Sequence, residues 1–384
     1  MKCKLSDICV FRKGKVEVAN LNTKNYISTE NMLSNKSGIT DASSLPTVSL
    51  TQEYKNGDVL VSNIRPYFKK IWHAQYDGGC SNDVLVFVPK SNTDSDFLYY
   101  VLADDDFFTY SMVTSKGTKM PRGDKTSIMQ YAVPMVDFCT QKKIASVLKS
   151  LDEKIELNNA INENLEQQLR SVFMELFSDK IANVEANNHR PLGELVINID
   201  NRGKTPPLET TPTEYPIIDV RALSGTSRIV NYANCTKFVS AETYSSWFRS
   251  GHPKPKDILV STVGSLAEIK IFLGSKGCIA QNVVGFRTKD ISPYYLYQYL
   301  TAIKNDLVAY NIGSVQPSIK VTHIIKHPIY IPSTEELETF DALAESATNA
   351  IYNNTLESER LAGIRDALIP KLMSGEIDLS EVQF

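Results

Sequence analysis

Two long stretches of the chain carry apolar residues at alternating spacings of four and three. The first runs from about Thr140 to Phe177, and the second from about Thr334 to Leu372. This is a heptad pattern, which predicts two long helices packed as a coiled coil. The predicted seam of the first helix is Ile144, Leu148, Leu151, Ile155, Asn158, Asn162, Leu165, Leu169, Val172 and Leu176.

The second seam follows from the first by a shift of 196 positions, which places Asn158 on Asn354 and Asn162 on Ser358. A polar seam residue costs stability but favours one register, because other registers leave it unpaired. The alternative is that each helix packs on its own domain with these residues in solvent. The second seam reads Phe340, Ala344, Ala347, Ile351, Asn354, Ser358, Leu361, Arg365, Leu368 and Leu372.

The first helix is predicted to be on the order of 55 Å long, from about 1.5 Å per residue. A rod of that length between two domains is suited to act as a spacer. Pro370 is predicted to end or kink the second helix, because proline lacks the backbone N–H that the helix needs.

Short apolar runs separated by turn residues predict a β-rich domain before each long helix. A helical stretch with regularly spaced tyrosine and leucine comes late in each half, at Asp96–Phe108 and Pro293–Tyr310. We interpret these aromatic residues as core packing. The predicted strands are Asp58–Ser62, Lys70–Ala74 and Asp83–Val88 in the first half, and Ile217–Val220, Asp257–Ser261, Glu268–Phe272 and Val283–Arg287 in the second.

The two halves are related by an internal repeat. Gly57-Asp58-Val59-Leu60-Val61-Ser62 returns as Lys256-Asp257-Ile258-Leu259-Val260-Ser261, at an offset of 199 positions. Further matches keep the same order: Gly79-Cys80 with Asn82 matches Gly277-Cys278 with Asn282, Gly117 with Pro121 matches Gly313 with Pro317, and Val133-Pro134 matches Ile331-Pro332. Such self-similarity indicates a duplicated structural unit.

The predicted fold class is therefore α+β, with two β-rich domains and two long helices. We place the first domain at 1–139, the central helix at 140–180, the second domain at 181–332 and the C-terminal helical region at 333–384.

Cysteine usage and apolar run lengths bear on location. The six cysteines are scattered and none forms a CxxC pair, which fits a reducing cytosol rather than a disulfide framework. The first residues contain no apolar stretch typical of a signal peptide, and the longest apolar runs are too short to cross a bilayer. A cytoplasmic protein is expected.

Charge is unevenly distributed along the chain, whose net charge is -3. The segment 333–384 holds 11 acidic and 3 basic residues, so the remainder has a net charge of +5. Mild basicity does not show nucleic-acid binding, but it leaves room for a local basic patch.

Motifs that would carry catalysis or a metal are not found in the sequence. Gly203-Lys204-Thr205 has Asn198 where a phosphate-binding loop needs glycine, and Pro206-Pro207 prevents the following helix. His323 and His327 lack the adjacent glutamate of a zinc helix, and Pro328 follows at once. No catalytic residue and no metal site is predicted.

Polar loops recur at matching places in both halves and suit DNA recognition. Arginine pairs with guanine and Asn or Gln with adenine, while Lys, Ser and Thr suit phosphate. The alternative is that surface loops are polar in any protein. The predicted contact residues are Asn63, Arg65, Lys69, Asn82, Lys116, Thr118, Lys119 and Arg122 in the first half, and Asn201, Arg202, Lys204, Thr205, Ser261, Thr262, Ser265, Gln281, Asn282, Ser314 and Gln316 in the second.

With these features the chain resembles the specificity (S) subunit of type I restriction-modification systems. The resemblance rests on the duplicated layout, on Asn201-Arg202-Gly203-Lys204-Thr205-Pro206, on Gln141-Lys142-Lys143-Ile144-Ala145, and above all on Leu368-Ile369-Pro370-Lys371-Leu372-Met373-Ser374-Gly375-Glu376-Ile377. It covers essentially the whole chain.

The resemblance implies that each β-rich domain reads one half of a split site in double-stranded DNA. The long helices would pack antiparallel, set the gap between half-sites and dock two methyltransferase (M) subunits. Restriction (R) subunits would join for cleavage. S-adenosylmethionine, ATP and Mg would bind the partner subunits and not this chain.

Two other classes of protein stay open. The first is a scaffold whose duplicated modules bind proteins and whose helices dimerise, for which affinity for DNA would not depend on salt. The second is an enzyme with an unrecognised site. A neighbouring gene with methyltransferase motifs would distinguish both from a specificity subunit.

Overall fold

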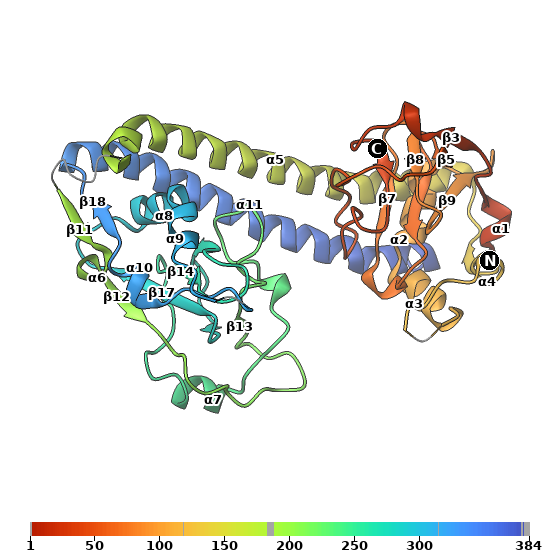
Figure 1. The fold of residues 1–384 in the computed structure, drawn as a ribbon. Helices are drawn as coiled ribbons and strands as arrows, with labels where there is room; N and C mark the ends of the chain where they lie inside the picture. Colours follow the sequence, from red (N-terminus) through yellow and green to blue (C-terminus); the bar gives the residue numbers. More distant parts are fainter. Residues whose placement is uncertain (1, 118, 183–187, 314, 378, 380–384) are drawn as a thin grey trace. The chain divides into compact units, whose positions relative to one another are not determined.

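A computed structural model describes residues 2–117, 119–182, 188–313, 315–377 and 379 of the chain. The chain divides into two compact units: unit 1 comprises Met1–Glu156 with Ser358–Phe384, and unit 2 comprises Leu157–Glu357. Two long helices, α5 (Phe138–Ala182) and α11 (Thr334–Ser374), contribute a segment to each unit (Figure 1). The predicted α+β class with two long helices is confirmed.

Unit 1 is built around a four-stranded antiparallel sheet in the order β2-β9-β6-β7. A second four-stranded sheet has the order β3-β5-β8-β4, and its strands alternate along the chain with those of the first. A two-stranded pair, β1-β10, joins the start of the chain to the entry of α5. Its strands are β1 (Lys2–Lys4), β2 (Cys9–Phe11), β3 (Lys15–Glu17), β4 (Tyr26–Ile27), β5 (Leu50–Tyr54), β6 (Val59–Ser62), β7 (Ile71–His73), β8 (Gly78–Cys80), β9 (Val84–Pro89) and β10 (Ala132–Pro134); its short helices are α1 (Leu5–Ile8), α2 (Ser95–Ala103), α3 (Asp105–Val113) and α4 (Lys125–Ile128).

Unit 2 repeats this plan with a sheet in the order β12-β17-β14-β15, a parallel pair β13-β16 and a terminal pair β11-β18. Its strands are β11 (His189–Pro191), β12 (Val196–Ile199), β13 (Ile217–Ile218), β14 (Ile258–Ser261), β15 (Ile269–Ile271), β16 (Cys278–Ile279), β17 (Val283–Thr288) and β18 (Pro328–Tyr330); its short helices are α6 (Leu192–Leu195), α7 (Ala241–Ser246), α8 (Pro293–Ala302), α9 (Lys304–Ala309) and α10 (Val321–Ile324).

The central strands read as continuous apolar runs because both faces of each sheet are buried. In unit 1, Val59 and Val61 of β6 face the core that includes the long helices, whereas Leu60 between them faces a second core around Tyr54. In unit 2, Ile258 and Val260 of β14 alternate in the same way with Leu259. Successive residues of a strand point to opposite faces of the sheet, so when both faces are buried every residue of the central strand is buried.

The repeated aspartate before each central strand is a folding residue. Asp58 accepts the backbone N–H of Lys55 at 2.7 Å, and Asp257 accepts that of Lys254 at 2.7 Å. Each buried carboxylate is also paired with an arginine, Arg12 at 2.5 Å in unit 1 and Arg287 at 2.7 Å in unit 2. A buried charge needs a partner, and the repeat preserves the aspartate but not the position of the arginine: Arg12 directly follows β2, whereas Arg287 lies in β17.

The stretch predicted to be helical late in each half is helical, and it is divided into two helices in each unit. Asp104 separates α2 from α3, and its carboxylate accepts the N–H of Asp106 at 3.1 Å as an N-cap. Ile303 separates α8 from α9. An N-cap satisfies the orphan N–H groups of a new helix, so it favours a break over continuation.

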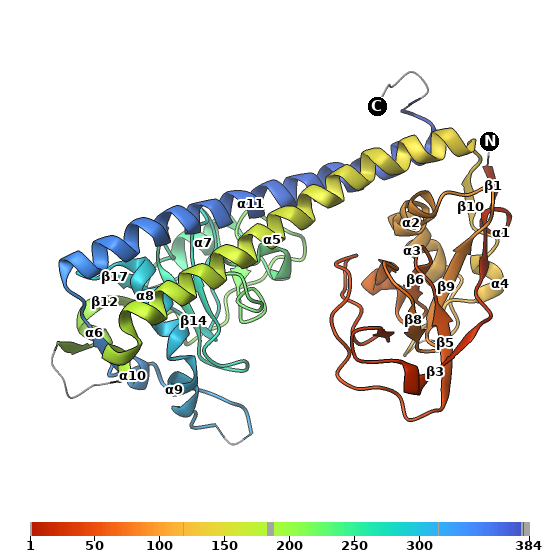
Figure 2. The same cartoon turned by 90° about the horizontal axis from the view of Figure 1, so that it is seen from above.

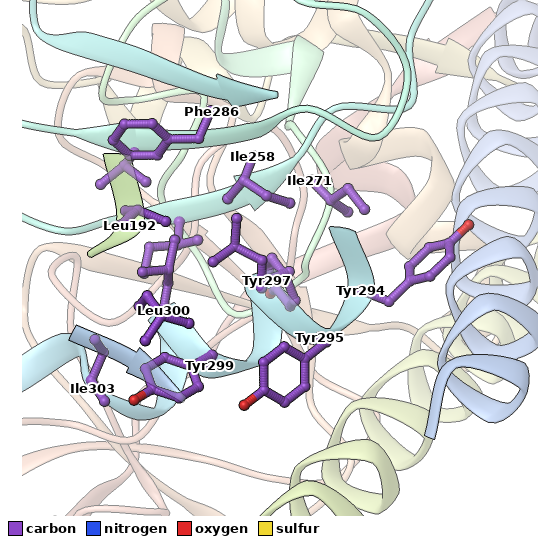
Figure 3. Packing of buried hydrophobic residues seen from close by; sticks show 14 of the residues in the cluster. Leu192, Ile258, Ile271, Phe286, Tyr294, Tyr295, Tyr297, Tyr299, Leu300 and Ile303 are labelled. Atoms are coloured by element: carbon purple, nitrogen blue, oxygen red, sulfur yellow. The ribbon is translucent and has the colours of Figure 1, made fainter. Parts of the chain in front are cut away.

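The tyrosines of α8 are core residues, and they pack against both long helices within unit 2 (Figure 3). Tyr295 is fully buried, lies 5.6 Å from Phe173 of α5 between ring centroids, and donates its hydroxyl to the carbonyl of Tyr330 at 3.0 Å. Phe340 of α11 joins the same cluster. Buried tyrosines require a partner for the hydroxyl, which the terminal β-pair provides here.

Within unit 2 the two long helices lie side by side and antiparallel (Figure 1; Figure 2). Their polar seam residues are in contact. The side-chain N–H of Asn354 donates to Asn162 Oδ1 at 2.9 Å, and that of Asn158 donates to Glu357 at 2.8 Å. Asn158 is 1% exposed, which rules out the alternative that it faces solvent. In unit 1 the helix segments are joined by the ion pair of Asp152 with Arg365 at 2.6 Å.

Replacing Asn354 by alanine is expected to lower the free energy of unfolding by about 1–2 kcal/mol, because Asn162 would lose its donor in a partly buried layer. Chemical denaturation followed by circular dichroism measures this change. Asn353→Ala, on the exposed side of the same helix turn, is the matched control and should change stability by less than about 0.5 kcal/mol. Equal effects of the two variants would contradict a structural role for the polar layer.

Pro370 does not end α11: the helix continues to Ser374 with the proline inside it, so of the two predicted effects, an end or a kink, the end is wrong. Ile369, Leu372 and Met373 around it are buried in the core of unit 1, and this packing offsets the missing N–H. Among the residues that the structure describes, no helix is long and apolar enough to cross a membrane.

Candidate nucleic-acid interface

The repeat extends to individual hydrogen bonds at the end of each central strand. In unit 1 the N–H of Asn63 donates to the carbonyl of Asp83 at 2.8 Å, and in unit 2 the N–H of Thr262 donates to that of Asn282 at 2.8 Å. The structural counterpart of Asn282 is therefore Asp83 and not Asn82, which corrects the match made from the sequence.

A loop after the helical stretch closes against the same point in both units. Arg65 N–H donates to the carbonyl of Pro121 at 2.9 Å, and Gly264 N–H to that of Pro317 at 3.0 Å. The return bonds also match, from Gly123 to Asn63 at 3.1 Å and from Ile319 to Thr262 at 2.8 Å. We call each set of meeting segments a junction: residues 62–65, 83, 116–117 and 119–123 in unit 1, and 261–264, 282, 312–313 and 315–319 in unit 2.

The two junctions share a backbone but differ in side chains. Left-handed backbone at the same point carries Arg65 (φ 51°) in unit 1 and Gly264 (φ 86°) in unit 2. The other matched pairs are Asn63 with Thr262, Asp83 with Asn282, Lys116 with Ile312, and Arg122 with Ser318. A constant frame with variable side chains is what two readers of different ligands of one class require.

The junction of unit 1 brings most of its predicted residues together and is basic. Arg122 pairs with Asp83 at 3.0 Å, and Lys116 pairs with Asp124 at 2.9 Å. The Lys116 ammonium, with hydrogen bonds from Ser127, lowers the pKa of Asp124 to about 2. The carboxylate therefore stays charged at neutral pH and holds the loop that ends at Arg122.

Each junction holds at least one buried polar atom without a hydrogen-bond partner among the described residues. These atoms are Asn63 Oδ1 and Arg65 Nε in unit 1 and Asn282 Oδ1 in unit 2. Buried polar atoms are nearly always paired in folded proteins, so such an atom can mark a place where a ligand supplies the partner.

Unit 2 carries its basic residues on other loops than unit 1. Residues 262–268 and 312–319 contain no lysine or arginine, while Arg202 and Lys204 lie on the loop that follows β12. Gln281 at the β16–β17 turn reaches this loop and donates to Thr205 Oγ1 at 3.0 Å. A pocket of ≈ 200 Å³ between them is lined by residues that include Asn201, Lys204, Thr205, Asp219, Lys237, Phe248, Gln281 and Asn282.

Four predicted contact residues have other roles in the structure. Ser261 and Thr262 are fully buried, and Ser261 donates its hydroxyl to the carbonyl of Ser265 at 2.5 Å, so neither side chain lies at the surface of unit 2. The side-chain amide of Asn201 donates to the carbonyl of Gly251 and accepts the N–H of Ser250, both at 2.9 Å. Arg202 is held by Asp200 at 2.6 Å, with its side chain 38% exposed.

The remaining predicted residues divide by exposure. Lys69 is half-buried and pairs with Asp105 at 2.7 Å. Thr118 and Ser314 lie outside the described residues. The exposed ones are Asn82, Lys116, Lys119, Arg122, Lys204, Thr205, Ser265, Gln281 and Gln316.

Sequence reasoning missed Lys237, Phe248 and Arg249 of unit 2 and Tyr67 and Phe68 of unit 1. Lys237 and Phe248 line the pocket, and Arg249 donates to the carbonyl of Arg202 at 3.0 Å. These residues are far from the 201–205 loop in sequence, and only the fold brings them to it. Tyr67 and Phe68 could have been noticed because two adjacent aromatic residues stand between Arg65 and Lys69.

The predicted helix seam lies in the packed region of each unit. Asn158 and Ile351 are buried in unit 2, and Leu148 is buried in unit 1. None of the nine seam residues singled out from the sequence is exposed: Leu148, Leu151, Ile155, Asn158, Leu165, Ile351, Asn354, Leu361 and Leu368.

Each unit has the same backbone hydrogen bonds at its junction and carries different side chains there, an arrangement that suits binding of two different ligands of one class. The family model of the type I restriction modification DNA specificity domain matches residues 1–167 and 186–357, and the chain belongs to this family. Its function is DNA-sequence recognition within a type I restriction-modification system, as expected from the resemblance.

Known proteins similar to the chain agree with this membership. The type I restriction enzyme HindI specificity subunit of Haemophilus influenzae is 24% identical and covers 92% of this chain and 94% of its own length. The MjaIX specificity subunit of Methanocaldococcus jannaschii is 24% identical, covering 77% of this chain and 72% of its own length. The crystal structure of the type I S subunit from M. genitalium has the same fold, with a TM-score of 0.58, 16% identity, and coverage of 97% and 96%.

Proposed function

We propose that the chain recognises a bipartite DNA site in which unit 1 reads one half and unit 2 the other. The observation that carries this proposal is the pair of junctions, which have the same backbone hydrogen bonds and different side chains. Arg65 and Arg122 suit guanine in the half read by unit 1, and Gln281 with Asn282 suits adenine in the half read by unit 2. The long helices would set the gap between the two halves.

The chain itself would supply recognition and no catalysis. Methyltransferase (M) subunits that carry S-adenosylmethionine would methylate adenine, and restriction (R) subunits that use ATP and Mg would cleave. Apolar side chains exposed on α5 and α11 support docking of the M subunits on the helices. In unit 2 these include Leu157, Ile161 and Leu356, each 40% exposed or more.

Selection from a random duplex pool by the purified complex of this chain with its M subunits tests the proposal. The expected result is enrichment of one motif with two specified blocks separated by an unspecified gap of constant length. A single uninterrupted block, or no enrichment, would contradict two half-site readers.

Binding is expected to weaken steeply as salt rises, since contacts between cations and phosphates release counterions. The double variant Lys116→Ala/Lys119→Ala should weaken binding about equally for all sequences and reduce the slope of log K against log salt by about 1–2. Titrations by fluorescence anisotropy at several salt concentrations measure this slope. A salt-independent affinity would favour a protein-binding scaffold instead.

A further inference from the structure

The loop that leaves the central strand is one residue longer in unit 1 than in unit 2. Ser62 N–H donates to the carbonyl of Lys70 at 3.0 Å, and Ser261 N–H donates to that of Glu268 at 2.9 Å, so both loops close at the same point. Both also end on a left-handed residue, Lys69 (φ 50°) in unit 1 and Ala267 (φ 54°) in unit 2. The extra residue therefore alters the tip of the loop and not its base.

The apolar residues of the two loops lie in different environments. In unit 2, Leu266 and Ala267 are 9% and 0% exposed and belong to the core. In unit 1, Tyr67 and Phe68 are 49% and 37% exposed, and their rings lie 4.7 Å apart between centroids. Unit 1 thus presents a pair of adjacent aromatic rings for which unit 2 has no counterpart in this loop.

The backbone around these rings is fixed at both ends. Phe68 N–H donates to the carbonyl of Arg65 at 3.0 Å, and the carbonyl of Phe68 accepts the N–H of Asn35 at 2.8 Å. Lys36 N–H donates to the carbonyl of Lys69 at 2.9 Å, and the Lys69 ammonium pairs with Asp105 at 2.7 Å. Rings on a fixed backbone contact a ligand with little loss of conformational entropy.

The two loops at the rings carry more cations than the carboxylates that neighbouring segments pair with them. Residues 63–70 and 115–123 contain no acidic side chain, and they carry Arg65, Lys69, Lys70, Lys116, Lys119 and Arg122. Three of these cations are paired, Lys69 with Asp105, Lys116 with Asp124 and Arg122 with Asp83, and the remaining excess suits a polyanion. The ammonium of Lys70 lies 5.8 Å from the centre of the Phe68 ring. Arg65 Nε, next to the rings in sequence, is buried without an acceptor among the described residues.

We propose that Tyr67 and Phe68 form an aromatic wedge that partly unstacks one base step in the half-site read by unit 1. This inference rests on the proposed function. Proteins that insert apolar side chains between base steps kink the duplex, and pyrimidine–purine steps yield most easily. Only the half-site of unit 1 is then deformed, and its specificity includes a flexible step that no polar side chain reads.

The test places 2-aminopurine, which fluoresces more when unstacked, at successive positions of both half-sites in duplexes bound by the complex with M subunits. Because the M subunits would flip the target adenine of each half-site out of the stack, 2-aminopurine is not placed at those two positions. At the other positions the wild-type complex is expected to raise fluorescence at one step of one half-site. Tyr67→Ala/Phe68→Ala should remove that signal and weaken binding by about 10- to 100-fold, the range typical of lost base–aromatic stacking. Tyr67→Leu/Phe68→Leu should retain part of the signal, because leucine also serves as a wedge.

Met135→Ala, which removes another exposed apolar side chain of unit 1, is the control and should behave as wild type. An unchanged signal in the double alanine variant, or no signal at any step with the wild-type complex, would overturn the wedge while site selection stands. Loss of M-subunit binding by the double variant would show instead that the rings contact protein. Absence of any selected site with the wild-type complex would be a failure of the proposed function itself.

Discussion

Replacing Arg228 by methionine is expected to lower the free energy of unfolding of unit 2 by about 3 kcal/mol or more. The sequence around Arg228 shows no pattern that would predict this effect. Its side chain is 1% exposed and forms two bonds to Glu166 of α5, at 2.9 and 2.8 Å. It also donates to Thr348 of α11 at 2.7 Å and lies 5.0 Å from the centre of the Tyr297 ring of α8. Removing the cation leaves the partly buried carboxylate of Glu166 without its partner.

Urea denaturation of the purified chain measures this loss. Arg190→Met is the matched control, because Arg190 also pairs with a glutamate in unit 2, Glu194 at 3.1 Å, but both side chains are exposed (45% and 55%). Exposed ion pairs contribute about 0–1 kcal/mol, so the control should remain close to wild type. Similar stability of the two variants would show that Arg228 does not connect the recognition domain to the helices.

Converting the junction of unit 1 to the side chains of unit 2 is expected to abolish recognition of one half-site only. The triple variant Asn63→Thr/Arg65→Gly/Arg122→Ser places the residues of the second junction on the backbone that both share. Each lost base contact costs about 1–3 kcal/mol, so the three together should reduce affinity for that half-site by 100-fold or more. Folding should survive, because glycine suits the left-handed backbone of Arg65.

Equilibrium binding to duplexes altered in one half-site at a time measures this effect. The triple variant should bind the cognate duplex and a duplex altered in the unit 1 half with the same affinity, and it should still lose affinity when the other half is altered. Met135→Ala again serves as the control for unit 1. Equal losses at both halves would indicate a general folding defect, and no loss would remove the junction from the interface.

The helices and the duplication could be predicted from the sequence because both depend on local or periodic features. The heptad spacing leads to α5 and α11, and the polar seam residues Asn158 and Asn354 lie in one packed layer. The repeated aspartate also marked equivalent positions correctly, since each carboxylate closes the same turn. Patterns of this kind follow from burial of one helix face or of alternate strand residues.

The sequence could not predict which polar residues are presented at the surface near the junctions, because residues distant in sequence meet there. Ser261 and Thr262 are polar residues at the end of β14, yet both are buried and bonded to the backbone. Asn201 belongs to a loop that suits DNA, but its amide holds the 250 region in place. Polarity alone does not separate a side chain that supports a loop from one that the loop presents.

The sequence gives the number of basic residues, but only the structure shows where they lie. Arg228 and Arg365 count as basic residues in the sequence, but one is buried and the other pairs with Asp152, so neither adds to a DNA surface. In unit 1 the basic residues of two separate loops meet at the junction, whereas in unit 2 they lie on the loop after β12. The two readers therefore present their cations on different elements.

Mapping of methyladenine in a host genome that expresses this chain with its M subunits tests the central claim most directly. The account predicts methylation at a single bipartite motif, with two specified blocks and a gap of constant length, and no such methylation when the chain is omitted. Methylation at one contiguous motif, or a pattern unchanged by omission of the chain, would contradict it.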